Sequence, residues 1–281
     1  MQKIAIITDS ACDLTLETIN KNDIKLFPLR IIYSYGEFED KINITSEEVY
    51  NSLDTEIPTT SLPSPKTCER ILNEIEAEGY THVIAISVSK ALSGTFNAFR
   101  LALENHPNLE STIFDSKIIG YCQGVIVLEA SKLVQAGKSY ENILEMLPKI
   151  RENVTGYYTL NTLEYLVKGG RLGKLAGAIG QFLHLKPIIT MDVTGVYCSV
   201  AKVRGRKQSI SKLYEIIKEH LDESKCKLWV LQGGALEEGT NFMESLRNLH
   251  NVVSVELTSV GAMVAAHSGR GMIGITIQKV D

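Results

Sequence analysis

Hydroxyl side chains and a glycine lie next to one another in the short segment ALSGTF. An apolar run of residues 80–88 precedes it and an amphipathic run of residues 94–105 follows, so Ser93, Gly94 and Thr95 stand between a predicted strand and a predicted helix. The first backbone N–H groups of a helix lack intrahelical partners, and the helix dipole attracts negative charge there. The spacing indicates either an anion site or a simple helix cap made by Ser93 or Thr95.

The motifs that accompany phosphate sites are missing from this turn. The sequence contains neither G-x-x-x-x-G-K-[ST] nor G-x-G-x-x-G, and Lys90 does not occupy the P-loop position. A site of hydroxyl and N–H groups without a fixed arginine favours a singly charged anion such as a carboxylate.

A second row of hydroxyls lies in TTSLPSP, which contains Thr60 and Ser61 and is stiffened by prolines. Ser64 followed by Pro65 is typical of a helix start, which explains those two residues without a ligand. Thr60 and Ser61 have no such explanation, so we expect them on a second wall of the same site.

His267 lies among small residues in AAHSG, so another backbone or a ligand can approach it closely. A single histidine is more often a buried structural residue with one hydrogen-bond partner than a ligand contact. The glycine-dense surroundings favour a ligand contact here.

An enzymatic alternative stays open at this stage. Ser93, His267 and either Asp9 or Asp115 could form a hydrolase triad, which would make the protein a Ser93-dependent esterase or acyltransferase. The sequence has no G-x-S-x-G elbow, no H-E-x-x-H motif and no C-x-x-C pair. We therefore expect no metal and no cofactor, and a binding protein rather than an enzyme.

Basic residues gather in two places, with Lys168 and Arg171 in YLVKGGRLGK and Arg204 in AKVRGRK. Such clusters form either a solvated face or a docking surface for an acidic partner or phosphate. The apolar, small-residue run of residues 175–185 between them is either a core helix or the lining of an apolar tunnel.

The elements that must position these residues alternate between strands and helices. Near-continuous apolar runs at residues 3–10, 24–34, 80–88 and 109–116 alternate with helical patterns, which predicts a parallel sheet covered on both faces. Ligands of such sheets lie beyond the carboxyl ends of the strands, where Thr8-Asp9-Ser10, Ser93 and Asp115-Ser116 are found.

A second α/β lobe with a mixed sheet is predicted after residue 150. Residues 186–205 have the pattern of a hairpin around the turn DVTG, and strands are expected at residues 226–234, 251–260 and 271–280. We divide the chain into domains 1–150 and 151–281. We expect the segment 45–65 to cross between the lobes, because its proline-rich end can form neither a helix nor a central strand of a sheet.

Composition excludes several classes of protein. The formal charge of −4 over 281 residues argues against nucleic acid and anionic membrane partners. The apolar run at the start of the sequence is too short for the hydrophobic region of a signal peptide, and no apolar stretch is long enough for stable membrane insertion. We therefore expect a cytoplasmic protein. Five scattered cysteines are expected to be reduced and mostly buried.

Eight motifs in order resemble the DegV family of bacterial fatty-acid-binding proteins: TDSACDL, TTSLPSP, SKALSGTF, FDSK, LEYLVKGGRL, KPII, KVRGRK and VGAMVAAHSGRGMIG. The resemblance runs from Thr8 to the end of the chain. It implies two α/β lobes with a long-chain fatty acid between them, the carboxylate held by hydroxyls and the tail in an apolar tunnel.

Individual roles follow only from this resemblance. It places Thr60, Ser93, the Gly94 N–H and His267 at the carboxylate, and it links Arg171 to docking of a separate ATP-dependent fatty acid kinase subunit, to which some members present the acyl group. This chain departs from the family at Arg270, where many members have proline or a small residue. Arg270 either adds a cation to the carboxylate or points to solvent.

Overall fold

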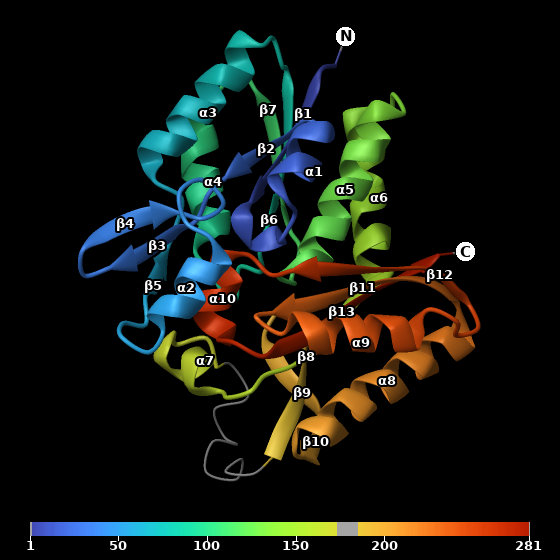
Figure 1. The fold of residues 1–281 in the computed structure, drawn as a ribbon. Helices are drawn as coiled ribbons and strands as arrows, with labels where there is room; N and C mark the ends of the chain where they lie inside the picture. The colour runs from blue at the N-terminus through green and yellow to red at the C-terminus, as the bar shows by residue number, and fades with distance from the viewer. Residues whose placement is uncertain (1, 173–184, 281) are drawn as a thin grey trace.

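Four parallel strands form the sheet of the N-terminal lobe in the computed structural model, which describes residues 2–172 and 185–280 (Figure 1). The sheet consists of β1 (Ile4–Asp9), β2 (Ile24–Phe27), β6 (His82–Ser87) and β7 (Glu110–Asp115). The spatial order is β2-β1-β6-β7, and the two central strands are buried along almost their whole length. Burial on both faces is why these strands are near-continuous apolar runs in the sequence.

Helices cover both faces of the parallel sheet. On one face lie α3 (Pro65–Ala77) and α4 (Thr95–Glu104), where the rings of Phe27 and Phe99 meet edge to face. The other face carries α5 (Tyr121–Gln135), against which α6 (Tyr140–Glu152) packs. Two shorter elements, the 3₁₀ helix η1 (Ser10–Cys12) and α1 (Leu16–Lys21), follow β1.

The C-terminal lobe is built on a six-stranded mixed sheet. It consists of β8 (Val154–Thr159), β9 (Leu185–Met191), β10 (Tyr197–Arg204), β11 (Lys225–Gly233), β12 (Val252–Ser259) and β13 (Met272–Val280). The order is β10-β9-β8-β13-β11-β12, in which β11 and β12 are parallel and the other neighbours antiparallel. One face packs on α8 (Arg206–Glu223) and α9 (Leu236–Leu246). β8 and β13 also contact α5, which thus lies between the two large sheets (Figure 1).

A small antiparallel sheet connects the lobes. It consists of β3 (Arg30–Tyr33), β4 (Gly36–Glu39) and β5 (Thr59–Ser61) in the order β4-β3-β5. Helix α10 (Ala262–Ser268) follows β12 in the sequence, yet it packs against β3, β5 and α2 (Ser46–Ser52), and against α7 (Glu164–Lys168). Figure 1 shows α2 and α10 side by side although they lie at opposite ends of the colour bar. This packing places β5 beside the end of α10.

The two-lobed α/β architecture predicted from the sequence is confirmed, with a parallel N-terminal and a mixed C-terminal sheet. The hairpin around DVTG is also confirmed, because β9 and β10 pair antiparallel across it. Ser64 caps α3, and Pro65 is its first residue, as expected. The domain boundary at residue 150 and the crossing of segment 45–65 stay predictions; the first strand of the mixed sheet begins at Val154.

Two predictions about elements are wrong. The single β-rich run over residues 24–34 is divided at Pro28, which lacks a backbone N–H for the ladder, into β2 and β3 of different sheets. The glycine-dense segment around His267 is a helix rather than a loop, because the apolar residues 262–266 bury it among neighbouring elements. Helices α2 and α6 and strand β8 were not predicted.

Side-chain burial agrees with the expectations for cysteine. All five cysteines lie in the described part of the chain as free thiols, and four of them are buried. Within residues 2–172 and 185–280, no helix combines the length and the apolar composition needed to cross a bilayer.

Candidate functional site

A cavity of about 320 Å³, here called the mouth cavity, lies where the small sheet, the start of α4 and the end of α10 meet. Its polar wall consists of Thr60, Ser61, Ser93, Gly94, Arg171 and His267. Its apolar wall consists of Leu29, Leu62, Val88, Leu92, Ile119, Tyr197 and Met263. The fold therefore brings together the hydroxyl rows, the glycine and the histidine that the sequence singled out, from segments up to 207 positions apart.

His267 and Thr60 are joined by a hydrogen bond of 2.8 Å between Nε2 and Oγ1. His267 is only 8% exposed, and burial, followed by the charge of Arg171, lowers its pKa to about 4. The ring is therefore neutral at physiological pH. Its Nδ1 atom is buried without a partner and faces Gly169, where a Cβ atom would lie 2.2 Å away.

The tautomer of His267 decides what Thr60 can donate. A buried N–H without an acceptor is costly, and the nearby Arg171 cation favours a lone pair, so the proton belongs on Nε2 rather than on Nδ1. The Nε2–H group then donates to Thr60 Oγ1. The hydroxyl hydrogen of Thr60 is left for another acceptor in the cavity.

Ser93 is oriented by Thr95. The Ser93 Oγ atom accepts from the Thr95 backbone N–H at 3.2 Å and lies 2.8 Å from Thr95 Oγ1. Gly94, with no side chain, is the N-cap residue of α4, so the expectation that Thr95 caps the helix is wrong. Thr95 is fully buried and lies behind Ser93 rather than on the cavity wall.

Ser61 is engaged by a neighbouring arginine. Arg30 Nη2 donates to Ser61 Oγ at 3.1 Å, while the same guanidinium pairs with Glu37. Because its oxygen accepts from Arg30, the Ser61 hydroxyl hydrogen is available to the cavity.

Arg171 changes the predicted chemistry of the site. The sequence indicated a site without a fixed arginine, whereas the Arg171 side chain lines the mouth cavity and donates to the Gly169 carbonyl at 2.5 Å. A half-buried guanidinium beside hydroxyl donors strengthens the preference for an anion. The other two predicted docking residues, Lys168 and Arg204, are exposed and do not line the cavity, and Lys168 pairs with Glu164 at 2.7 Å.

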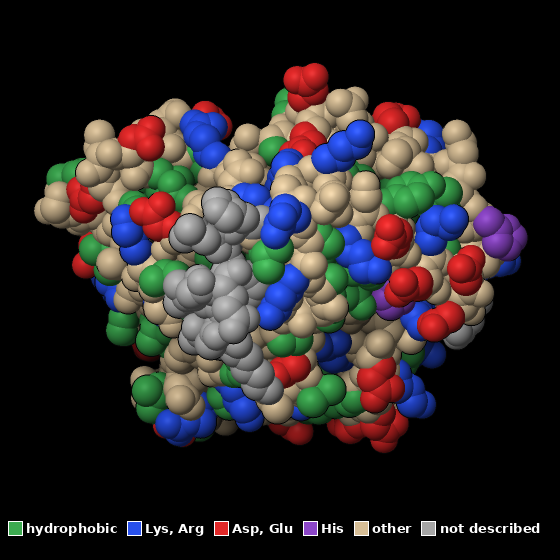
Figure 2. All heavy atoms as spheres, turned by 90° about the horizontal axis from the view of Figure 1, so that it is seen from below, with side chains coloured by type: hydrophobic (Ala, Val, Ile, Leu, Met, Phe, Trp, Pro, Cys, Tyr) green, Lys and Arg blue, Asp and Glu red, His purple; other side chains and the backbone are tan. Residues whose placement is uncertain are grey.

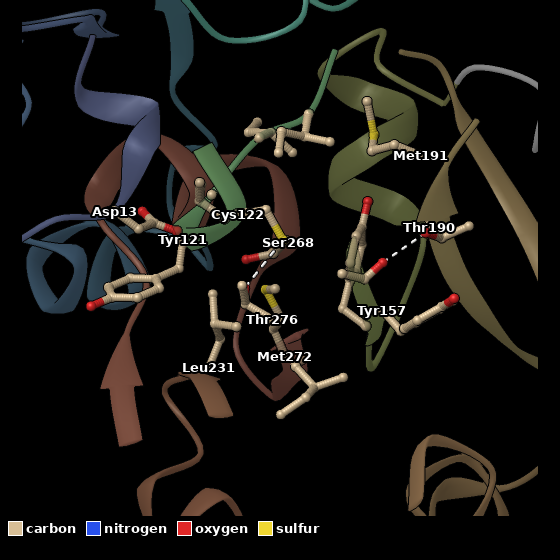
Figure 3. Close-up of a pocket in the computed structure, with 18 of the residues that line it drawn as sticks. Asp13, Tyr121, Cys122, Tyr157, Thr190, Met191, Leu231, Ser268, Met272 and Thr276 are labelled. Atoms are coloured by element: carbon tan, nitrogen blue, oxygen red, sulfur yellow. Dashed lines mark hydrogen bonds between the residues drawn. The ribbon is translucent and has the colours of Figure 1, made fainter. Parts of the chain in front are cut away.

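A second, smaller cavity of about 70 Å³, here called the inner cavity, lies next to the mouth cavity and is lined by residues of both lobes. The two cavities share Ile119, Tyr197 and His267 as lining residues. Figure 3 shows Tyr121 and Cys122 on one side of the inner cavity and Met191, Tyr157 and Thr190 on the other. Leu231 and Met272 also line it. Of the apolar run of residues 175–185, considered as a tunnel lining, residues 175–184 lie outside the described residues.

Some polar groups of the inner cavity are already hydrogen-bonded to one another. Cys122 Sγ lies 3.2 Å from Thr276 Oγ1, and Thr190 Oγ1 donates to the Gly156 carbonyl at 2.7 Å (Figure 3). Groups satisfied in this way present mainly carbon to a ligand. A polar mouth that continues into an apolar interior suits a molecule with one anionic end and a long hydrocarbon part.

The hydrolase triad considered from the sequence is not assembled by the described residues. His267 Nε2 bonds to Thr60 rather than to Ser93, and its Nδ1 atom has no carboxylate partner. Asp9 accepts from the Ala11 and Val88 backbones, and Asp115 from those of Lys90 and Lys117. Ser93 therefore has no base positioned to activate it.

Arg270 does not reach either cavity. It pairs with Glu47 at 2.9 Å, bonds to Asn51 and lies over the ring of Tyr50, 5.1 Å from its centroid. Of the two alternatives from the sequence, a cation at the carboxylate is excluded. Arg270 instead ties the end of α10 to α2.

Comparison with known proteins identifies the family. The sequence profile of the uncharacterised DegV family matches residues 3–280. The chain belongs to the DegV family. A DegV domain-containing protein of Clostridium perfringens is 51% identical to it over 279 residues, which are 99% of each chain.

Solved structures share the DegV fold. DegV of Bacillus subtilis, a fatty acid binding protein, matches with a TM-score of 0.91 and 29% identity over 100% of both chains. The fatty acid kinase B3 protein of Streptococcus pneumoniae, solved with linoleic acid, matches with a TM-score of 0.83 and 22% identity over 100% of both chains. At 22% identity, the similarity to the Streptococcus pneumoniae protein shows only that the two chains share a fold.

Sequence reasoning missed two features of this DegV site. Arg171 was assigned to a docking surface because the family resemblance links it to a kinase subunit, and its position on the cavity wall depends on how α7 packs against α10. The close approach of Gly169 to His267 was not predicted. The paired glycines in YLVKGGRLGK were the available signal, since such a close approach needs a residue without Cβ.

We expect His267 to stay neutral from pH 8 to pH 5, so its imidazole nitrogen signals should not titrate in that range by NMR. Because its pKa falls from 6.5 to about 4 on folding, the folded state binds fewer protons. Its contribution to stability is complete above pH 6.5 and is lost as the pH falls towards 4, by about 3 kcal/mol in total. In His267→Gln this acid-side loss should be smaller; titration of the His267 signals near pH 6.5 would contradict the assignment.

Proposed function

We propose that this DegV protein binds a long-chain fatty acid, with the carboxylate in the mouth cavity and the acyl tail in the inner cavity. The observation that carries the proposal is that the two cavities adjoin at Ile119, Tyr197 and His267: hydroxyl donors and Arg171 line the mouth cavity, and the inner cavity is largely apolar. The fatty acid bound by the Bacillus subtilis relative supports the same class of ligand.

The energetics favour a long tail. A carboxylate loses hydration on burial and is costly unless it is well hydrogen-bonded, while each buried methylene contributes about 0.8 kcal/mol. Thr60, Ser93 and Arg171 supply three hydrogen-bond donors to the carboxylate in the mouth cavity. These hydrogen bonds offset most of the free energy lost when the carboxylate is desolvated. A tail of many carbons then provides the net affinity.

The inner cavity must widen to take such a tail. At about 70 Å³ it is narrower than ordinary ligand pockets. Two of its lining residues, Met191 and Met272, have flexible side chains that repack at low cost. Entry of the tail is expected to move these methionines rather than the strands that carry them.

The protein further acts as a carrier that presents the fatty acid to a separate ATP-dependent kinase subunit, in the cytoplasm, without catalysing a reaction itself. The DegV motif KGGR and the position of Arg171 at the mouth support this role. Lys168 and Arg204 are exposed, and Lys168 lies three positions before Arg171. Figure 2 shows basic and acidic side chains intermingled on the lower face of the molecule. The contact with a partner is therefore local rather than spread over a uniformly basic surface.

Docking and lipid binding can be separated by substitution. Lys168→Ala/Arg204→Ala, which leaves the cavity wall intact, should lower acyl-phosphate formation with a kinase subunit and ATP while fatty acid affinity stays the same. Arg171→Ala should lower both, because Arg171 lines the cavity. Unchanged acyl-phosphate formation in the double variant would remove these two residues from the docking surface.

The direct test of the proposed function is mass spectrometry of an organic extract of the purified protein. We expect long-chain fatty acids in near-stoichiometric amount, and a fluorophosphonate probe should not label Ser93. An extract without fatty acid, combined with failure of added palmitic acid to bind, would refute the proposal. Labelling of Ser93 would favour the esterase or acyltransferase alternative.

A further inference from the structure

Two carboxylates from outside the helix cap the N-terminus of α10. Asp13 Oδ1 accepts from the Gly261 N–H at 2.8 Å, and Asp40 Oδ1 accepts from the Ala262 N–H at 3.1 Å. They lie 248 and 222 positions away in the sequence, after η1 and after β4. The helix has no side-chain cap of its own. The N–H groups of Gly261 and Ala262 are therefore satisfied by side chains from the N-terminal part of the chain.

Burial of these two aspartate side chains is unfavourable in free energy. Asp13 and Asp40 are 2% and 1% exposed, and the Asp13 Oδ2 atom is buried without a hydrogen-bond partner among the described residues. Lys41 is the nearby cation: a Cβ atom on Gly261 would lie 3.0 Å from Lys41 Nζ and 3.2 Å from Asp13 Oδ1. Because the cost of desolvation offsets most of the favourable interactions of a buried carboxylate, a contribution to folding stability does not explain why Asp13 and Asp40 are buried here.

The other end of α10 carries a residue of the candidate site. His267 is five positions after Ala262, about 7.5 Å along the axis at 1.5 Å per residue, and it lines both cavities. A helix of seven residues is too short to be stable by itself, so its place depends on its packing against β3, β5, α2 and α7 and on the contacts at its ends. A shift of α10 along its axis would break the 2.8 Å bond between His267 and Thr60.

We propose that Asp13 and Asp40 are positioning residues of the fatty acid site: by holding the first N–H groups of α10, they set the place of His267 against Thr60. The inference rests on the proposed function for its ligand. It assigns to the two carboxylates a role in affinity that acts through the helix. Asp13 also lines the inner cavity, whereas Asp40 lines neither cavity, so the effect of Asp40 on affinity is the one that isolates the action through α10.

The test compares Asp13→Ala and Asp40→Ala with Asp13→Asn and with Ser139→Ala, a control that removes the side-chain cap of the remote helix α6. Palmitic acid affinity is measured by calorimetry well below the melting temperature of each variant. Imidazole ¹⁵N shifts of His267 are recorded in parallel and assigned with His267→Gln.

Both alanine variants should bind palmitic acid about 10-fold more weakly and shift the His267 signals, since the lost cap releases the helix. Asp13→Asn keeps an oxygen that accepts from Gly261, so it should stay within about threefold of the wild type. Ser139→Ala should lower only the melting temperature. Folded alanine variants with wild-type affinity and unchanged His267 signals would overturn the proposal.

Asp40→Glu provides a second test in case an alanine variant does not fold. It keeps the charge and the acceptor but moves them by one methylene, so it should also weaken binding and shift the His267 signals; wild-type behaviour of both would count against positioning. If the wild-type protein itself does not bind palmitic acid, the proposed function fails, while the His267 shifts still decide whether Asp13 and Asp40 place the helix.

Discussion

Thr60→Val/Ser93→Ala is expected to weaken binding of a long-chain fatty acid by at least about 100-fold. Each substitution removes a hydroxyl donor from the mouth cavity. A hydrogen bond to a charged group contributes about 1.5–3 kcal/mol, so two of them correspond to about 3–6 kcal/mol, or roughly two to four powers of ten in affinity. Calorimetric titration of delipidated protein with palmitic acid measures the effect.

The matched control is Thr59→Val, one position earlier on β5. Thr59 is exposed and does not line the cavity, so this variant changes the same type of side chain on the same strand without touching the site. It should bind as the wild type does. Equal affinity of the wild type and of the Thr60/Ser93 double variant would show that the carboxylate lies elsewhere.

Gly169→Ala is expected to weaken fatty acid binding by about 10- to 100-fold with little change in the backbone. Gly169 has a φ of −74°, which alanine adopts freely, but the new Cβ would lie 2.2 Å from His267 Nδ1. The ring must move away from Thr60, and a buried hydrogen bond is lost at a cost of about 1–3 kcal/mol. The measurement is again palmitic acid affinity, together with the His267 imidazole shifts.

The neighbouring glycine provides the opposite case. Gly170 has a φ of +69° and open space around its Cα, so Gly170→Ala introduces backbone strain of about 1 kcal/mol and no steric clash. It should lower the melting temperature and leave affinity unchanged. If Gly170→Ala impaired binding as strongly as Gly169→Ala, general disturbance of the turn would explain both, and the contact with His267 would not.

The strands and most helices could be predicted because local physics specifies them. Parallel strands covered on both faces are continuous apolar runs, as in β1 and β6, and Ser64 with Pro65 begins a helix by its own side chain and fixed φ. Pro28 could also have indicated the division between β2 and β3, but the apolar residues on both sides of it favoured a single strand. Helix α10 was missed because its caps come from Asp13 and Asp40, far away in the chain.

The sequence by itself determined the two-lobed α/β class, the hydroxyl-rich turns and the family. Only the tertiary structure decided which of these side chains meet: that His267 bonds to Thr60 rather than to Ser93, that Arg171 lines the cavity while Arg270 holds α2, and that Thr95 lies behind Ser93. The reason is physical. Periodicity and capping depend on neighbours within a few residues, whereas a site assembled from segments up to 207 positions apart depends on how short helices and edge strands pack.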